Sequence, residues 1–140
     1  MTRRATVGQR IGAGVLATGI LAVLLVAAWL DPANAGHGTH EQLGLPACGF
    51  AMAFDRPCVS CGMTTAFSTL VEGRPVAAFL IQPAGTVLAL LAATVFWPLV
   101  HVAAFGSRLL DDLALLARPK VVWLGVGVLA ISWLYKWVTW

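Results

Sequence analysis

Three long runs of apolar residues alternate with polar segments along the chain. The runs cover residues 11–30, 84–105 and 121–140. A helix of about twenty residues, rising 1.5 Å per residue, crosses the ~30 Å hydrocarbon core of a bilayer. The pattern therefore predicts three transmembrane helices. Lys136 is the one charged residue within these runs, and it lies close enough to the end of the third for its side chain to reach the membrane surface.

The segments between the runs have the composition of connections outside the membrane. Asp31-Pro32 ends the first run, because the residue before a proline disfavours helical geometry, and glycine and proline are frequent in the stretch that follows. From Cys58 the apolar residues recur at spacings of three and four, until Gly73-Arg74-Pro75 interrupts the pattern. This helix is too short to span a bilayer, so we expect it at the interface.

The sequence thus predicts an all-α integral membrane protein that forms a single membrane domain, residues 1–140. The expected order is a cytoplasmic start at 1–10, a membrane helix at 11–30, an outer loop at 31–57, an interfacial helix at 58–72, a membrane helix at 84–105, a cytoplasmic loop at 106–120 and a membrane helix at 121–140.

The first run has a second interpretation, as a cleaved signal peptide. Ala33-Asn34-Ala35 has the small-x-small form of a signal peptidase site, and arginines precede the run. The run is longer than the ~7–15 residues of a signal peptide's apolar region, which favours a retained anchor.

Composition supports a membrane protein and excludes other classes. Hydrophobic residues make up 59% of the 140 residues and charged residues only 11%, which is too apolar for a soluble domain of this size. The net charge of +3 is spread over short flanks, so nothing favours nucleic-acid binding. The expected surroundings are the lipid bilayer and other membrane-protein subunits.

The positions of basic residues predict the orientation. With the N-terminus inside, six basic residues lie on the inner side and three on the outer side, as the positive-inside rule requires. Tryptophans fall at both expected interfaces. We therefore expect the bacterial cytoplasmic (inner) membrane, with a cytoplasmic N-terminus and the cysteine loop on the periplasmic face. The inner set is Arg3, Arg4, Arg10, Arg108, Arg118 and Lys120; the outer set is Arg56, Arg74 and Lys136; the tryptophans are Trp29, Trp137 and Trp140 outside and Trp123 inside.

All three cysteines of the chain lie within fourteen residues. If a helix begins near Cys58, then Cys58 and Cys61 share its first turn, where the helix dipole favours a thiolate. In an oxidising compartment a structural disulfide is expected, between Cys58 and Cys61 or between Cys48 and either of them. Thiol-disulfide exchange is an alternative, although the βαβ pattern that usually surrounds a C-x-x-C motif is missing from the sequence.

Two histidines near the cysteines raise a metal-binding alternative. His37 and His40, together with the cysteines, form a mixed nitrogen and sulfur set suited to zinc or copper. Three cysteines alone do not complete a tetrahedral site, and histidines in a glycine-rich loop are more often solvated than bound to metal.

His101 lies inside the second apolar run. An ionisable side chain at such a position normally faces protein or water, so we expect a neutral histidine hydrogen-bonded to a neighbouring helix. Ligation of a haem or a chlorophyll is the alternative.

One stretch resembles a known family. Cys48, then Cys58-x-x-Cys61-Gly62-x-Thr64-x-Ala66, and then residues 70–79 and Gln82-Pro83, resemble small bacterial membrane proteins classified only as a domain of unknown function. The likeness covers roughly residues 48–91. Here Val59-Ser60 replaces the family's usual Pro-Gly, Thr65 replaces an arginine and Gln82 replaces an asparagine. The resemblance implies a multi-span membrane protein with a cysteine-bearing turn, and no established reaction.

Three functions remain open from the sequence. The favoured one is a non-catalytic accessory subunit of a larger respiratory, photosynthetic or transport complex, because small residues and six tryptophans offer packing surfaces while the charged groups of a hydrolase are missing. The alternatives are a zinc- or copper-binding protein and a membrane thiol-disulfide oxidoreductase.

Overall fold

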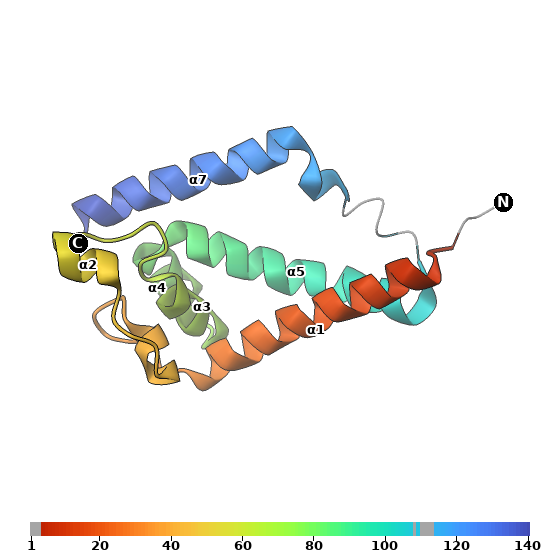
Figure 1. Cartoon of the computed structure of the whole chain (residues 1–140), viewed down its shortest axis with the longest axis horizontal. Coiled ribbons are helices and arrows are strands. Elements are labelled where there is room, and N and C mark those ends of the chain that lie inside the picture. Colours follow the sequence, from red (N-terminus) through yellow and green to blue (C-terminus); the bar gives the residue numbers. More distant parts are fainter. Residues whose placement is uncertain (1–3, 108, 110–113) are drawn as a thin grey trace.

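Three long helices form the frame of the computed structural model, which describes residues 4–107, 109 and 114–140. They are α1 (Val7–Trp29), α5 (Pro83–Phe105) and α7 (Pro119–Val138), and each is long and apolar enough to cross a membrane (Figure 1). The regular elements of the described part are all helical, so the predicted all-α class with three membrane-length helices is confirmed. A short 3₁₀ helix, η2 (Ala114–Ala117), precedes α7.

The observed helix ends differ slightly from the predicted ones. α1 begins at Val7 rather than residue 11, because Thr6 and Gln9 form a reciprocal capping box that starts the helix earlier. α7 begins at Pro119, since proline suits the first turn of a helix.

α1 and α5 pack against each other with small side chains. Ala13 and Ala17 of α1 are buried against Leu99 and Val102 of α5. Beyond this contact the guanidinium of Arg10 donates to the carbonyl oxygens of Ala103 and Ala104, at 3.1 and 2.8 Å. These carbonyls belong to the last turn of α5, where helical partners are lacking and a positive charge is favoured. The start of α1 therefore caps the end of α5.

The opposite end of this pair holds two short helices, α3 (Met63–Val71) and α4 (Pro75–Ile81). We call it the cysteine end. Ala66 and Phe67 of α3 are buried, and Phe67 packs with Ala27 of α1 and Ala89 of α5. The apolar stripe of the short helix is therefore buried against the ends of α1 and α5. At Gly85 of α5 an added methyl group would lie only 3.3 Å from Ala66 Cβ, so glycine permits the close approach of α3.

The predicted start of this helix is wrong. It was expected at Cys58, but residues 58–62 form two successive turns, in which the Cys61 amide donates to the Cys58 carbonyl and the Met63 amide to the Ser60 carbonyl, both at 3.0 Å. Gly62 has a φ of 82°, a left-handed conformation that cannot continue an α-helix. Cys58 and Cys61 therefore lie in a turn before α3 and not in its first turn.

The long loop before α3 contains two more short helices, η1 (Thr39–Leu43) and α2 (Gly49–Phe54). The loop is fixed to α3 by a buried hydrogen bond of 2.8 Å between the hydroxyls of Thr39 and Thr65, and the Thr39 hydroxyl also accepts from the Ala33 amide. Thr65, which replaces the family's usual arginine, is therefore a fully buried packing residue.

α7 contacts the other helices mainly through its C-terminal half. The Ala84 amide donates to the Ser132 hydroxyl at 3.1 Å, and the Tyr135 hydroxyl donates to the Leu80 carbonyl at 2.9 Å. In the N-terminal half Trp123 is 72% exposed, and the space beside Gly125 and Gly127 is open among the described residues. Figure 1 shows α7 running apart from α1 along most of its length.

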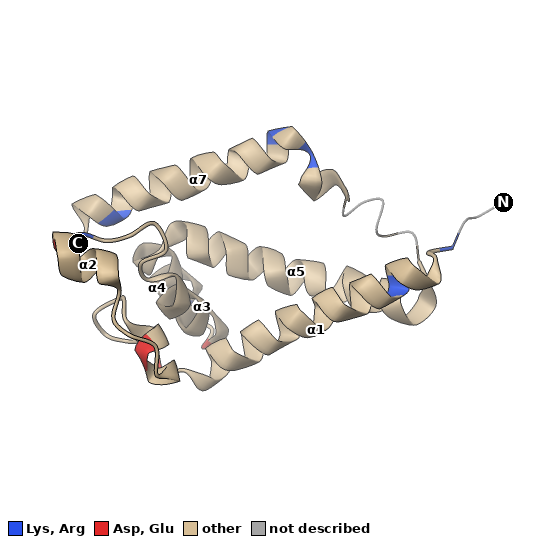
Figure 2. Cartoon of the chain, in the orientation of Figure 1, with Lys and Arg blue, Asp and Glu red and all other residues tan. Residues whose placement is uncertain are grey.

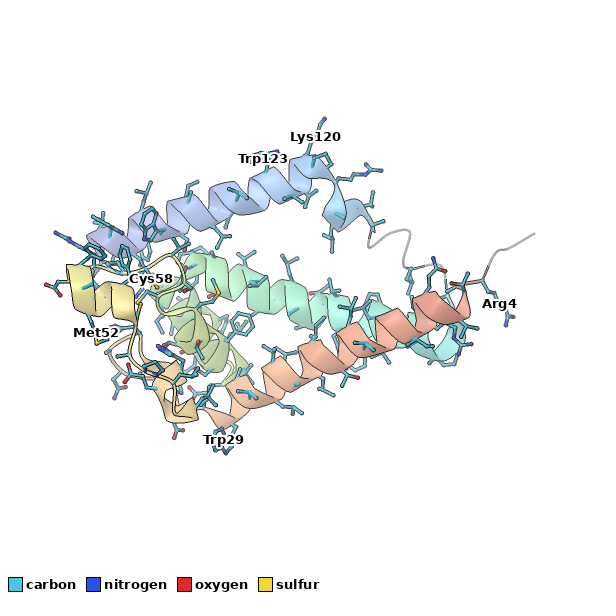
Figure 3. All side chains as sticks on the ribbon, viewed as in Figure 1. Arg4, Trp29, Met52, Cys58, Lys120 and Trp123 are labelled. Atoms are coloured by element: carbon cyan, nitrogen blue, oxygen red, sulfur yellow. The ribbon has the colours of Figure 1, made fainter. Side chains whose placement is uncertain are left out.

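Charged and aromatic residues gather at the two ends. Figure 2 shows Lys and Arg (blue) near the start of α1 and the start of α7, with a smaller amount at the C-terminal end of α7, whereas Asp and Glu (red) appear near the cysteine end. Trp29 and Trp123 lie at opposite ends (Figure 3). Arg3 and Arg108, which contribute to the predicted orientation, lie outside the described residues. The basic residues at the end away from the cysteines are consistent with the positive-inside rule. The orientation in the membrane stays a prediction.

Candidate thiol site

A cavity of about 520 Å³ lies at the cysteine end. The long loop, α2 and the turn before α3 form it, and the last residue of the chain closes one side. It brings together the predicted site residues of the loop and the cysteine turn. Its lining includes His37, His40, Glu41, Cys48, Met52, Cys58, Ser60, Cys61, Met63, Thr64 and Trp140. Figure 3 shows Met52 on α2 and Cys58 beside this helix.

Cys58 is half-buried and lines the cavity together with Cys48 and Cys61. Burial is the largest single influence and raises the pKa of Cys58, but hydrogen bonds from Ser60 and Cys48 and from the backbone outweigh it, so the pKa is lowered below 9.0. The Ser60 oxygen lies 3.5 Å from the Cys58 sulfur. Cys58 thus ionises more readily than an ordinary cysteine thiol, and the thiolate is the reactive form of cysteine.

Cys61 has the opposite character. It is buried, and burial, together with the nearby Cys58, raises its pKa to about 11, against the opposing effect of the Lys136 ammonium. Cys61 is therefore a protonated thiol at neutral pH and a weak nucleophile.

Lys136 is buried beneath the cysteine turn, with only 6% of its surface exposed. The expectation that it extends to the membrane surface is wrong, because the long loop and the cysteine turn both fold over the end of α7. A methyl group on Gly62 would lie 2.6 Å from the Gly36 carbonyl oxygen and 3.2 Å from Lys136 Cε. Only glycine fits between these groups, so Gly62 joins the loop, the cysteine turn and α7.

The side chain of Gln82 also contacts the cysteine turn. The sequence singled out Gln82 only as a replacement for the family's usual asparagine, and it gave no reason to expect this contact. Its fully buried amide donates to the Val59 carbonyl at 3.3 Å, and its amide oxygen accepts from the Ser132 hydroxyl. The Ala84 amide donates to the same Gln82 oxygen at 3.2 Å. One side chain thus connects the turn, α5 and α7.

Aromatic residues near the end of α7 contact the loop and the turn. The Trp133 indole donates to the Pro57 carbonyl at 3.0 Å, and the Trp140 ring lies 4.6 Å from that of His37. The Arg56 guanidinium lies 5.2 Å from the Trp137 ring. Trp137 and Trp140 were expected only as part of an interfacial belt, and no role was predicted for Trp133. The structure adds a second role, because they fix the segment that carries the cysteines.

The two histidines line the cavity but are bonded to backbone. His37 Nδ1 lies 3.0 Å from the Ala35 carbonyl oxygen, and His40 Nε2 lies 3.3 Å from that of Pro46. Within the described part of the chain no three histidine, cysteine, aspartate or glutamate side chains converge as metal ligands would. Zinc or copper binding therefore stays a prediction that this arrangement does not support.

The three cysteines are free thiols in the structure. The structure does not show the predicted disulfide, and the Cys58 sulfur lies 3.5 Å from the Ser60 hydroxyl oxygen. Disulfide formation in oxidised protein stays a prediction.

His101 lies far from this cavity, on an exposed face of α5. The centroid of its ring lies 4.9 Å from that of Phe105, one turn further along the same helix, and the two rings are tilted by 47°. The structure therefore places it where a bilayer or another protein would contact it, and not between the three long helices.

The family model described as "Protein of unknown function (DUF2752)" matches residues 48–97. The match bears out the resemblance to a family of unknown function, and it spans the cysteine turn, α3, α4 and the first part of α5. The helices α1 and α7 lie outside it. No curated protein and no solved structure matches the chain.

Proposed function

We propose that the protein is a membrane thiol-disulfide oxidoreductase in which Cys58 and Cys48 form the reactive pair. The observation that carries this proposal is that Cys48 and Cys58 both line one cavity, which is large enough for a substrate segment. The contrast between Cys58, whose pKa is lowered, and Cys61, whose pKa is raised, supports the assignment of roles.

The proposed reaction transfers two electrons from a substrate dithiol to a Cys48–Cys58 disulfide. A substrate thiolate attacks the Cys48 sulfur, and Cys58 leaves as a thiolate, which is favoured because a thiol of lower pKa leaves faster. The second substrate thiolate then attacks the substrate sulfur of the mixed disulfide and displaces Cys48. The products are a substrate disulfide and the reduced pair, and the two protons of the substrate pass to the released thiolates and to water.

The proposed location is the bacterial inner membrane, with the cysteine end on the periplasmic side. The basic residues at the opposite end support this orientation, and an oxidising compartment suits disulfide formation. The three membrane-length helices would hold the cavity at that surface.

A single-turnover experiment tests the proposal. Purified full-length protein is oxidised with a small-molecule disulfide, freed of reagent and mixed with a peptide that carries two cysteine thiols. We expect one peptide disulfide per protein, and none from Cys48→Ser or Cys58→Ser. Cys61→Ser is the matched control, because Cys61 is outside the proposed pair. Retained activity in Cys48→Ser, or none in unmodified protein, contradicts the proposal.

A second candidate is the accessory-subunit role. The exposure of His101 within a membrane-length helix, and of Trp123 on the free half of α7, supports a protein partner within the bilayer. Native mass spectrometry after mild solubilisation tests it. A larger assembly that contains the chain supports the subunit role, and a monomer without partners contradicts it. The same spectrum reports zinc or copper, since near-stoichiometric metal would favour the metal-binding alternative.

A further inference from the structure

A second cavity, of about 380 Å³, lies between α1 and α3 at the same end of the molecule. We call it the α1–α3 groove. Its walls are apolar side chains of α1 and the side chains of Met63, Thr64 and Phe67 from the start of α3. Val23 and Val26 on its rim are about half exposed, so the groove opens sideways from a helix that is long enough to span the membrane. An occupant would therefore enter from the hydrocarbon phase.

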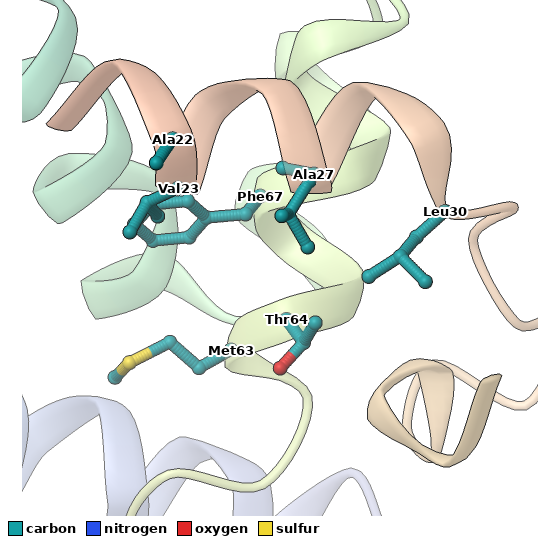
Figure 4. Close-up of a pocket in the computed structure, with 8 residues that line it drawn as sticks. Ala22, Val23, Ala27, Leu30, Met63, Thr64 and Phe67 are labelled. Carbon is teal, nitrogen blue, oxygen red and sulfur yellow. The ribbon is translucent and has the colours of Figure 1, made fainter. Parts of the chain in front are cut away.

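The α1–α3 groove adjoins the cysteine cavity. Met63 and Thr64 line both, and they immediately follow the turn that carries Cys58 and Cys61. Figure 4 shows Met63 and Thr64 at the N-terminal end of α3, across the groove from Val23 and Ala27 of α1. The Thr64 hydroxyl is a hydrogen-bonding group at the junction, while the rest of the lining is hydrocarbon and the Met63 sulfur. The arrangement suits a ligand with an apolar tail and a polar head next to the thiols.

We propose that the α1–α3 groove binds a lipid-soluble quinone, with its isoprenoid chain along α1 and its ring at Met63 and Thr64. This proposal rests on the proposed oxidoreductase function, because repeated turnover requires an electron acceptor for the Cys48–Cys58 pair. A quinone is the class of acceptor that matches the geometry: it dissolves in the bilayer, its chain fits an apolar groove, and its ring carbonyls accept hydrogen bonds from a hydroxyl.

The reaction balances without any further reagent. The Cys58 thiolate adds to the quinone ring, and the Cys48 thiolate then attacks the Cys58 sulfur. The carbon–sulfur bond breaks, its electron pair stays on the ring, and the Cys48–Cys58 disulfide forms. The reduced ring takes up two protons, in sum those of the two thiols, and leaves as a quinol. Two electrons thus pass from the thiol pair to one quinone.

A pair of substitutions on α1 tests the groove. Ala22 lines it, whereas Ala28 is equally an exposed alanine of α1 but lies outside it. Reduced full-length protein in phospholipid nanodiscs is mixed with a 1,4-benzoquinone that carries a ten-carbon chain, and quinol formation is followed by absorbance. Ala22→Phe should lower the second-order rate by about tenfold, the equivalent of losing about two buried methylene contacts. Ala28→Phe should stay within about twofold of the unmodified protein.

The outcomes separate this inference from the proposed function. Single-turnover oxidation of the dithiol peptide, measured on the same samples, shows that each variant is folded and that the thiol pair works. If peptide oxidation proceeds but Ala22→Phe reduces the quinone as fast as the unmodified protein, the groove holds lipid chains only and the inference is wrong. If the quinone binds and Ala22→Phe weakens that binding, measured by tryptophan quenching, while no variant oxidises the peptide, the oxidoreductase function is wrong and the quinone site remains.

Discussion

Substituting Gly62 by alanine tests the packing that holds the cysteine turn in place. Gly62 has a φ of 82°, and an added methyl group would lie 2.6 Å from the Gly36 carbonyl oxygen. The left-handed conformation costs a residue with a side chain about 1–2 kcal/mol. The contact is shorter than non-bonded atoms tolerate, so the loop must move, at a further cost of about 1–3 kcal/mol. We therefore expect Gly62→Ala to lower the free energy of unfolding by about 2–5 kcal/mol.

Gly73→Ala is the matched control for this prediction. Gly73 has nearly the same φ, 80°, but no atom lies within 4 Å of an added methyl group. It should show the backbone cost alone, about 1–2 kcal/mol. The assay is reversible unfolding in mixed micelles, with alkylation of Cys61 in a Cys48→Ser/Cys58→Ser background as a local measure. Gly62→Ala should expose Cys61 and speed its alkylation by about tenfold or more. Equal losses of free energy in the two variants, with unchanged alkylation, would refute the packing argument.

Three further predictions follow from the described contacts. Phe67→Ala, which removes a buried ring, should cost about 3–5 kcal/mol of unfolding free energy, whereas Phe79→Ala at a half-exposed position should cost far less; equal losses would contradict the burial of α3. Gln82→Ala leaves the Val59 carbonyl and the Ser132 hydroxyl without this partner and should cost about 1–3 kcal/mol, measured by the unfolding midpoint. The raised pKa of Cys61 means that the unfolded chain releases this proton near pH 9 while the folded protein retains it until about pH 11, so stability should fall across this interval. Cys61→Ser should remove that decline, and a decline that persists in the variant would exclude Cys61 as its cause.

The three membrane helices could be predicted from the sequence because twenty consecutive apolar residues have few other stable arrangements. The apolar stripe of α3 was equally readable, since Met63, Phe67 and Leu70 recur with helical spacing and all contribute to one apolar cluster. The first residue of α3 could not be predicted, because the helical spacing of the sequence continues backward through Cys58. The left-handed conformation of Gly62 that delays the helix is set in a fold that brings Gly36 and Lys136 close to it.

The residues of the candidate site could largely be predicted from the sequence, but their hydrogen bonds and relative positions could not. Grouping His37 and His40 with the cysteines was justified, since all of them line one cavity. Their backbone hydrogen bonds, and the contrast between Cys58 and Cys61, depend on local turns that spacing does not reveal. Gln82 and Ser132 are fifty residues apart in the sequence, so a connection through their side chains requires the fold to be known.

Lys136 shows a different limit. Its distance from the end of the apolar run suggested that the side chain reaches the membrane surface, but the loop and the cysteine turn cover that end of α7. The sequence of α7 alone does not reveal this cover, because the loop begins about a hundred residues before Lys136.

Differential alkylation of the cysteines in intact membranes tests the central claim most directly. The membranes are denatured in acid and all thiols are trapped with a light reagent in denaturant; disulfides are then reduced, the released thiols are labelled with a heavy reagent, and each cysteine is read by mass spectrometry. The account predicts heavy label on Cys48 and Cys58 together and light label on Cys61. In purified protein freed of quinone, an excess of dithiol peptide should leave all three cysteines light. Light label on all three cysteines before the peptide is added, or heavy label on Cys61 paired with either of the others, would contradict it.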